Sequence, residues 1–166
     1  MILVLAEHRG GSLNRASWEA VAAAQQLAAE GPLTVAVLGA TVGAAARELS
    51  AAKATEVVTV EHPALEPYTP DGYVAALQEV IAQLTPTVVV LPHTYQTRDF
   101  APTIAARMDR ALITDVIKLR VSAGEVTFAR PMFQGKLTAD VTPLGPSPHF
   151  VTVQIEIGRA SCRERV

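Results

Sequence analysis

The chain has 166 residues and a formal net charge of −2, so it fits one domain and has no excess of basic residues to bind nucleic acid. Hydrophobic residues make up 49% of the chain and aromatic residues only 5%, which predicts an aliphatic core. The apolar runs have the length of strands, no signal peptide is recognisable, and the single cysteine excludes an internal disulfide. We therefore expect a cytoplasmic protein without membrane insertion.

The first two thirds of the chain alternate apolar runs of strand length with helical patterns. Strands are expected at 1–6, 33–38, 56–60 and 87–91. Helices are expected at 15–29, 41–52, 71–84 and 97–108. Ser12 or Asn14 is expected to cap the first helix and Thr97 the last one. Strands that alternate with helices predict a mainly parallel sheet with helices on both faces.

The last third of the chain has a different pattern, because short extended segments follow one another without helices. These segments are expected at 113–121, 126–130, 136–141 and 150–155, with a hairpin turn at 122–125. We therefore predict a three-layer α/β fold with antiparallel strands added at the C-terminal end of the parallel sheet.

Motifs for phosphate binding, metal binding and nucleophilic catalysis are absent from the sequence. It contains no G-x-G-x-x-G or P-loop pattern, no pair of histidines spaced for zinc and no G-x-S-x-G elbow. The loop from Gly39 to Gly43 could approach a phosphate, but it also fits a tight turn between a strand and a helix, which we favour. The loop at 10–12 lacks the Ser and Asp of the ATP pyrophosphatase loop. We expect no metal site; the sequence leaves a Ser/His/Asp triad open, but nothing in it points to one.

Two polar segments are candidates for contact with a ligand or a partner. The first follows the fourth expected strand, and its candidate residues are His93, Thr94, Gln96 and Arg98. The alternative is that this segment only caps the helix at Thr97, with Asp99 complementing the helix dipole. The second lies between two extended segments, and its candidate residues are Arg130, Gln134, Gly135 and Lys136. An interface is favoured for it over a solvated hairpin.

The final residues, 156–166, differ from the rest of the chain. Their sequence EIGRASCRERV reads as the conceptual translation of a common sequencing adapter, and the alternative is a native basic tail. We therefore expect one domain at 1–155, a non-native tail at 156–166 and a longer natural protein.

Several segments, in order and without large gaps, resemble the N-terminal domain of electron transfer flavoprotein alpha subunits. They are the opening segment 1–13, the stretch from Leu91 to Arg107, Thr114–Ile117, the F-x-R-P-x-[FY]-x-G-[NK] segment at Phe128–Lys136, and the strand Val151–Val153. Together these segments cover the chain from residue 1 to about 155.

The resemblance implies one subunit of a heterodimeric electron carrier rather than a self-contained enzyme. Such carriers take electrons from flavoprotein dehydrogenases, including those of fatty acid β-oxidation, to a membrane-bound quinone oxidoreductase or another acceptor. The N-terminal domain of the alpha subunit has a fold related to adenine nucleotide alpha hydrolases and serves as scaffold and contact for the beta subunit. FAD is held mainly by a C-terminal domain that is absent here, so no FAD is expected on this fragment. The alternative is a stand-alone module that binds a nucleotide or a partner.

Overall fold

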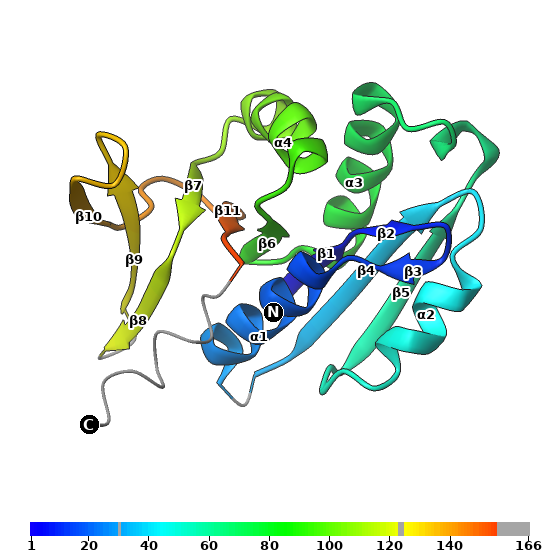
Figure 1. The fold of residues 1–166 in the computed structure, drawn as a ribbon, viewed down its shortest axis with the longest axis horizontal. Coiled ribbons are helices and arrows are strands. Elements are labelled where there is room, and N and C mark those ends of the chain that lie inside the picture. Colours follow the sequence, from blue (N-terminus) through cyan, green and yellow to red (C-terminus); the bar gives the residue numbers. More distant parts are fainter. Residues whose placement is uncertain (30, 123–124, 156–166) are drawn as a thin grey trace.

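A sheet of six parallel strands forms the centre of the protein, with strand order β5-β4-β1-β6-β11-β7 (Figure 1). The computed structural model describes residues 1–29, 31–122 and 125–155. The strands of this sheet are β1 (Ile2–Ala6), β4 (Leu33–Gly39), β5 (Glu56–Glu61), β6 (Val88–Pro92), β7 (Leu112–Val116) and β11 (His149–Val153). β1, β4, β5 and β6 lie where the sequence predicted strands; β1, β4 and β6 are continuously apolar because both of their faces are covered, whereas the edge strand β5 is partly exposed.

Helices cover both faces of the sheet (Figure 1). They are α1 (Arg15–Ala28), α2 (Gly43–Leu49), α3 (Pro70–Leu84), α4 (Tyr95–Met108) and a short 3-10 turn, η1 (Pro63–Leu65). Successive residues of β1 point to opposite faces, so Val4 packs in the core under α1 and α2, while Leu3 and Leu5 pack under α3 and α4. This arrangement confirms the expected three-layer α/β fold.

The helix caps agree only in part with the sequence. Asn14 caps α1 as expected, since its side-chain oxygen accepts a hydrogen bond from the backbone N–H of Ala16. The expected cap of α4 at Thr97 is wrong: Thr94 has the extended backbone of a cap, and its hydroxyl oxygen accepts from the N–H of Thr97. The helix therefore begins at Tyr95, and Thr97 lies buried in its first turn.

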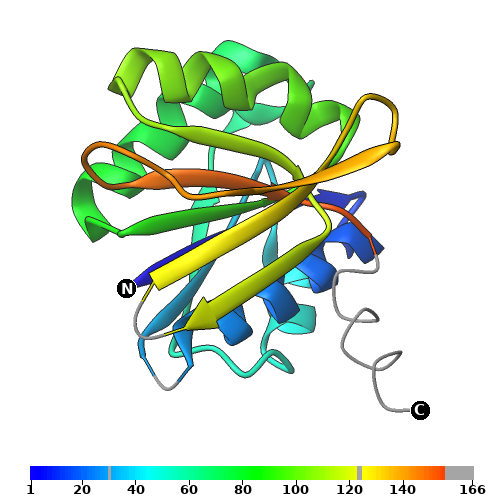
Figure 2. The same cartoon turned by 90° about the vertical axis from the view of Figure 1, so that its left-hand side faces the viewer.

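A second, antiparallel sheet packs beside the first (Figure 2). Its strands are β8 (Lys118–Ser122), β9 (Glu125–Met132) and β10 (Leu137–Val141). A separate small hairpin of β2 (His8–Arg9) and β3 (Ser12–Leu13) follows β1 and precedes α1 in the chain. Phe128 of β9 is fully buried in the same core as α1, and this contact anchors the antiparallel sheet. The strand expected at 113–121 divides at Ile117, because β7 belongs to the parallel sheet and β8 to the antiparallel one.

The last strand corrects the sequence prediction. The segment 150–155 was expected among the antiparallel strands, but β11 runs parallel between β6 and β7. Phe150 and Val151 are buried on opposite faces of the sheet, as in the other central strands. The expected turn at 122–125 lies partly outside the described residues, and the expected non-native tail at 156–166 lies wholly outside them, so the tail stays a prediction.

Candidate functional site

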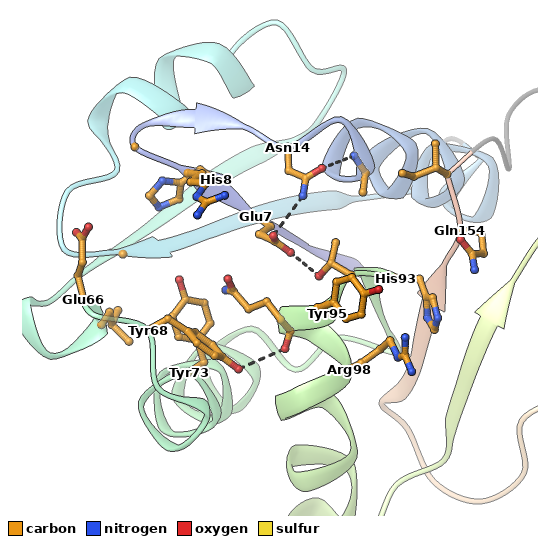
Figure 3. Close-up of a pocket in the computed structure, with 18 residues that line it drawn as sticks. Glu7, His8, Asn14, Glu66, Tyr68, Tyr73, His93, Tyr95, Arg98 and Gln154 are labelled. Carbon is orange, nitrogen blue, oxygen red and sulfur yellow. Dashed lines mark hydrogen bonds between the residues drawn. The ribbon is translucent and has the colours of Figure 1, made fainter.

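A crevice of about 790 Å³ opens at the carboxyl ends of β1 and β6 (Figure 3). The chain leaves β1 toward β4 and β5, and then crosses to the other side of β1 to form β6. Such a reversal of strand order is where open α/β sheets place their ligands. The crevice is therefore the first place to look for a functional site.

Glu7, directly after β1, occupies the centre of the crevice (Figure 3). One carboxylate oxygen accepts a hydrogen bond from the Thr94 hydroxyl at 2.6 Å, and the other accepts from the Asn14 side-chain amide at 3.2 Å. Its backbone N–H donates to the hydroxyl oxygen of Ser17 at 2.7 Å. Glu7 thus joins the end of β1 to the starts of both α1 and α4.

This arrangement limits what the crevice can bind. Dinucleotide-binding folds place a phosphate at the start of the helix that follows the first strand, where the helix dipole favours an anion. Here Asn14 caps that helix and the negative charge of Glu7 lies beside it. A second anion placed at the start of α1 would be repelled by Glu7, so this position differs from the usual phosphate site, although Arg9 and Arg98 also line the crevice.

The Gly39 loop also has a structural explanation. The His8 ring donates a hydrogen bond from Nε2 to the carbonyl oxygen of Leu38 at 3.0 Å, since a carbonyl can only accept. A side chain at Gly39 would place its Cβ 2.6 Å from His8 Nε2. Further along, the backbone N–H of Val42 donates to the Glu61 carboxylate at 2.8 Å. The loop is a tight turn whose glycine makes room for His8, which supports the favoured alternative.

Two tyrosines form the wall of the crevice on the α3 side (Figure 3). The Tyr68 hydroxyl donates to the Asp99 carboxylate at 3.0 Å, and the Tyr73 hydroxyl donates to the Leu38 carbonyl at 3.2 Å. Burial raises the pKa of both phenols, and for Tyr68 the hydrogen bond to Asp99 raises the pKa further. Both hydroxyls are therefore protonated donors at neutral pH.

The structure brings the first set of predicted residues together. His93, Thr94, Gln96 and Arg98 all line the crevice. Thr94 has the clearest task, because it both caps α4 and donates to Glu7. Tyr95 is 89% exposed, and the Arg98 guanidinium lies 5.7 Å from the centre of its ring. The sequence analysis did not single out Glu7, although an acidic residue directly after a buried strand was the available signal.

The second set of predicted residues is divided by the structure. Arg130 lines a smaller hollow together with His93 and Arg98. Gln134, Gly135 and Lys136 instead lie at the exposed turn between β9 and β10. They line neither the crevice nor this hollow.

The turn between β9 and β10 exposes apolar side chains under backbone strain. Phe133 is 71% exposed and has a φ of 51°, a conformation that bulky residues rarely adopt. Leu137 and Met132, which face each other across the hairpin, are also exposed. We call Met132, Phe133 and Leu137 the hairpin tip. An exposed aromatic residue held in a strained conformation is more typical of an interaction surface than of a solvated turn.

Comparison with known proteins identifies the family. The model of the family described as "Electron transfer flavoprotein domain" matches residues 2–164. The chain belongs to the electron transfer flavoprotein family. The resemblance noted in the sequence is thereby confirmed, whereas the expected end of the domain at residue 155 stays a prediction.

Several relatives from the electron transfer flavoprotein family are clearly similar in sequence. The chain is 37% identical over 145 residues to electron transfer flavoprotein subunit alpha of Bacillus subtilis, which covers 87% of this chain and 45% of the relative. It is 32% identical over 142 residues to the corresponding subunit of Syntrophomonas wolfei, which covers 86% of this chain and 44% of the relative. It is also 33% identical over 122 residues to acryloyl-CoA reductase electron transfer subunit beta of Anaerotignum propionicum, covering 72% of this chain and 33% of that relative. The chain thus spans less than half the length of these curated relatives.

The helices of this electron transfer flavoprotein domain are short. In the described part of the chain, none has both the length and the apolar character needed to cross a bilayer.

Proposed function

We propose that this chain is the N-terminal part of an electron transfer flavoprotein alpha subunit and serves there as scaffold and contact surface for the beta subunit. The observation that supports this most is the Glu7 carboxylate in the crevice, hydrogen-bonded to Thr94 and Asn14 where a nucleotide-binding fold would hold a phosphate. A domain whose ligand position is filled by its own side chain is better suited to a structural task than to binding a cofactor.

In this proposal the electron chemistry depends on FAD held by the part of the protein that follows, because the start of α1, where such folds bind a phosphate, is occupied by the Asn14 cap and the Glu7 carboxylate. The chain matches less than half the length of its alpha-subunit relatives, which leaves room for such a part. Flavin supplies reversible electron transfer when it is bound, and the chain described here would not be an enzyme by itself. A cytoplasmic location stays a prediction.

The redox partners belong to the same proposal. Flavoprotein dehydrogenases would deliver electrons, and a quinone oxidoreductase or another acceptor would receive them. The name of the Anaerotignum relative refers to a reductase instead, so the partner enzymes differ within the family. A role in fatty acid β-oxidation is therefore one option among several.

The hairpin tip is the surface we propose for the beta subunit. Its apolar residues Phe133 and Leu137 are 71% and 60% exposed, and burial of such side chains drives most protein association. The neighbouring polar residues Gln134, Gly135 and Lys136 would form the rim of this contact. Leu144 is 84% exposed but lies outside the hairpin, and it offers a matched control.

The first experiment tests cofactor binding. Isothermal titration calorimetry of the full chain with FAD, AMP and ATP should give no binding tighter than millimolar, and gel filtration should leave no flavin absorbance on the protein. Tight binding of AMP or ATP would instead favour the stand-alone nucleotide module, and retained FAD would overturn the scaffold proposal.

The second experiment tests the partner. The full chain is co-expressed with the beta subunit of the Bacillus subtilis electron transfer flavoprotein, with the first half of the Bacillus alpha subunit as positive control. Co-purification is expected for the wild type and for Leu144→Ser, and a large loss is expected for Phe133→Ser and Leu137→Ser. Equal recovery of all variants would exclude the hairpin tip, and failure of the wild type beside a working control would count against the heterodimer.

A further inference from the structure

A second hollow, of about 480 Å³, lies next to the crevice, where α4 faces the ends of β7, β9 and β11. The residues that line it include His93 and Arg98 from the α4 side, Asp115 of β7, Arg130 of β9 and Thr152 of β11. This volume lies within the range of sites for small molecules. Nothing in the proposed scaffold role requires a polar hollow at this place.

Among the residues that the structure describes, neither Arg98 nor Arg130 forms a salt bridge with a carboxylate. The buried Nε of Arg130 donates to no acceptor within residues 1–29, 31–122 and 125–155. The guanidinium of Arg98 lies over the ring of Tyr95. By contrast, the surface arginines Arg107 and Arg120 form salt bridges with carboxylates at 2.9 and 2.7 Å. A buried guanidinium N–H without an acceptor lowers the stability of the fold. We therefore expect an acceptor from outside the domain to bind the Nε–H of Arg130.

The one carboxylate in the hollow is engaged by other groups. Asp115 accepts a hydrogen bond from the Gln154 side-chain amide, and its Oδ1 lies 3.9 Å from His93 Nε2. Its backbone N–H donates to Thr152 Oγ1 at 3.0 Å. Asp115 has a φ of 65°, which is an uncommon conformation outside glycine. These contacts with Gln154, Thr152 and His93 hold Asp115 in place. Asp115 therefore does not pair with Arg98 or Arg130.

His93 contributes a neutral donor. Burial lowers the pKa of His93; the carboxylate of Asp115 opposes this shift, and the guanidinium groups of Arg98 and Arg130 add to it. The ring Nδ1 lies 2.8 Å from Thr152 Oγ1, whose proton is free to be donated because this oxygen accepts from Asp115 N–H. We assign the imidazole proton to Nε2 on this basis. With His93 neutral, two guanidinium groups and one carboxylate give the hollow a single positive charge.

We propose that this hollow binds one carboxylate group between Arg98 and Arg130. A monoanion neutralises the remaining charge and accepts from the unsatisfied Nε–H of Arg130, whereas a dianionic phosphate would leave the hollow with a net negative charge beside Asp115. The carboxylate can come from a small organic acid or from an acidic side chain of a partner polypeptide. The proposal does not depend on the scaffold role, since it rests on the charges and contacts within the hollow.

The test observes the arginine side chains directly. Nε–Hε resonances of the ¹⁵N-labelled full chain are followed by NMR during separate titrations with acetate, with the peptide acetyl-Gly-Glu-Gly-amide and with inorganic phosphate, against sodium chloride at equal ionic strength. The Arg98 and Arg130 resonances should shift and saturate, with a Kd on the order of millimolar. The resonance of Arg120, which already pairs with Asp140, should not move.

Variants separate binding from folding. We expect two substitutions, Arg98→Gln at an exposed position on α4 and Arg130→Gln, each to weaken carboxylate binding about tenfold. This is the effect expected for the loss of one charged hydrogen bond. Arg120→Gln should bind as the wild type does, and thermal unfolding checks that each variant is folded. Saturation with acetate supports a small organic acid, and saturation with the peptide alone supports an acidic side chain. Absence of any saturating shift, or tighter binding of phosphate than of both carboxylates, would overturn the proposal.

Discussion

Removal of the Glu7 carboxylate should destabilise the domain strongly, because three elements meet at this side chain. In Glu7→Ala, the Thr94 hydroxyl loses an acceptor at 2.6 Å and the Asn14 amide loses one at 3.2 Å. A hydrogen bond to a charged group contributes about 1.5–3 kcal/mol, and the Asn14 contact is long and therefore weaker. We expect the free energy of unfolding to fall by about 3 kcal/mol, with Glu7→Gln losing about half as much because it keeps an acceptor for Thr94.

Chemical denaturation with urea measures this loss, and differential scanning calorimetry checks it. In a domain of this size, about 3 kcal/mol corresponds to a decrease in Tm of roughly 6–12 °C. A double-mutant cycle with Thr94→Ala isolates the bond between the two side chains from the role of Thr94 as cap of α4, and it should give a coupling of about 1–2 kcal/mol. Glu66→Ala is the control, since Glu66 lines the same crevice.

A Glu7→Ala variant that loses less than about 0.5 kcal/mol, the usual range for a surface substitution, would contradict the role assigned to Glu7. A coupling near zero would refute it in another way, since it would show that Thr94 and Glu7 act independently. In either case the hydrogen bonds of Glu7 would not hold the start of α1 and the start of α4 to the end of β1, and the scaffold proposal would lose support.

Three other substitutions test the packing and the pH dependence. Gly39→Ala should cost about 1–3 kcal/mol in urea denaturation, because the new Cβ would lie 2.6 Å from His8 Nε2. Phe128→Ala should cost about 3–5 kcal/mol, since it removes the aromatic anchor of the antiparallel sheet. Burial lowers the pKa of His93 below its unfolded value of about 6.5, so the wild type should be fully stabilised above this pH and lose stability as the pH falls through it, while His93→Gln loses less.

Each of these predictions has a matched control. Gly43→Ala should have little effect, because the nearest atom to its new Cβ is the end of the Arg47 side chain at 3.8 Å. Leu137→Ala should be nearly neutral for stability, since Leu137 is 60% exposed. His62→Gln, at an exposed position, is the matched histidine control for the pH profile. Equal losses in a variant and its control would contradict the corresponding explanation.

The sequence predicted the parallel part of the fold because each buried strand has a local signature. The apolar residues of β1, β4 and β6 form continuous runs, and each is followed by a helix with recognisable ends. The placement of β11 was wrong although Phe150–Val153 shows the same buried pattern. No helix directly precedes this strand. Its place depends on pairing with β6 and β7, which are distant in sequence, and a local pattern does not show such pairing.

The sequence predicted only the part of the candidate site that lies at the start of α4. His93, Thr94, Gln96 and Arg98 were recognisable as polar residues after a buried strand, the position where such sheets bind ligands. Glu7 was missed because its partner Thr94 is 87 residues away along the chain. The link between Arg130 and His93 was missed for the same reason, since the antiparallel excursion brings β9 back to the end of the parallel sheet.

The position of β11 has a consequence for the synthesis of the protein. β7 joins the parallel sheet only through β11, and β6 has an open edge until β11 lies beside it. While the ribosome is still making residues 149–153, the growing chain therefore presents unpaired backbone groups on β7 and on β6, which is otherwise apolar. Nascent chains that stall before this segment should need a chaperone to stay free of aggregates, and completion of a single five-residue strand should end that need.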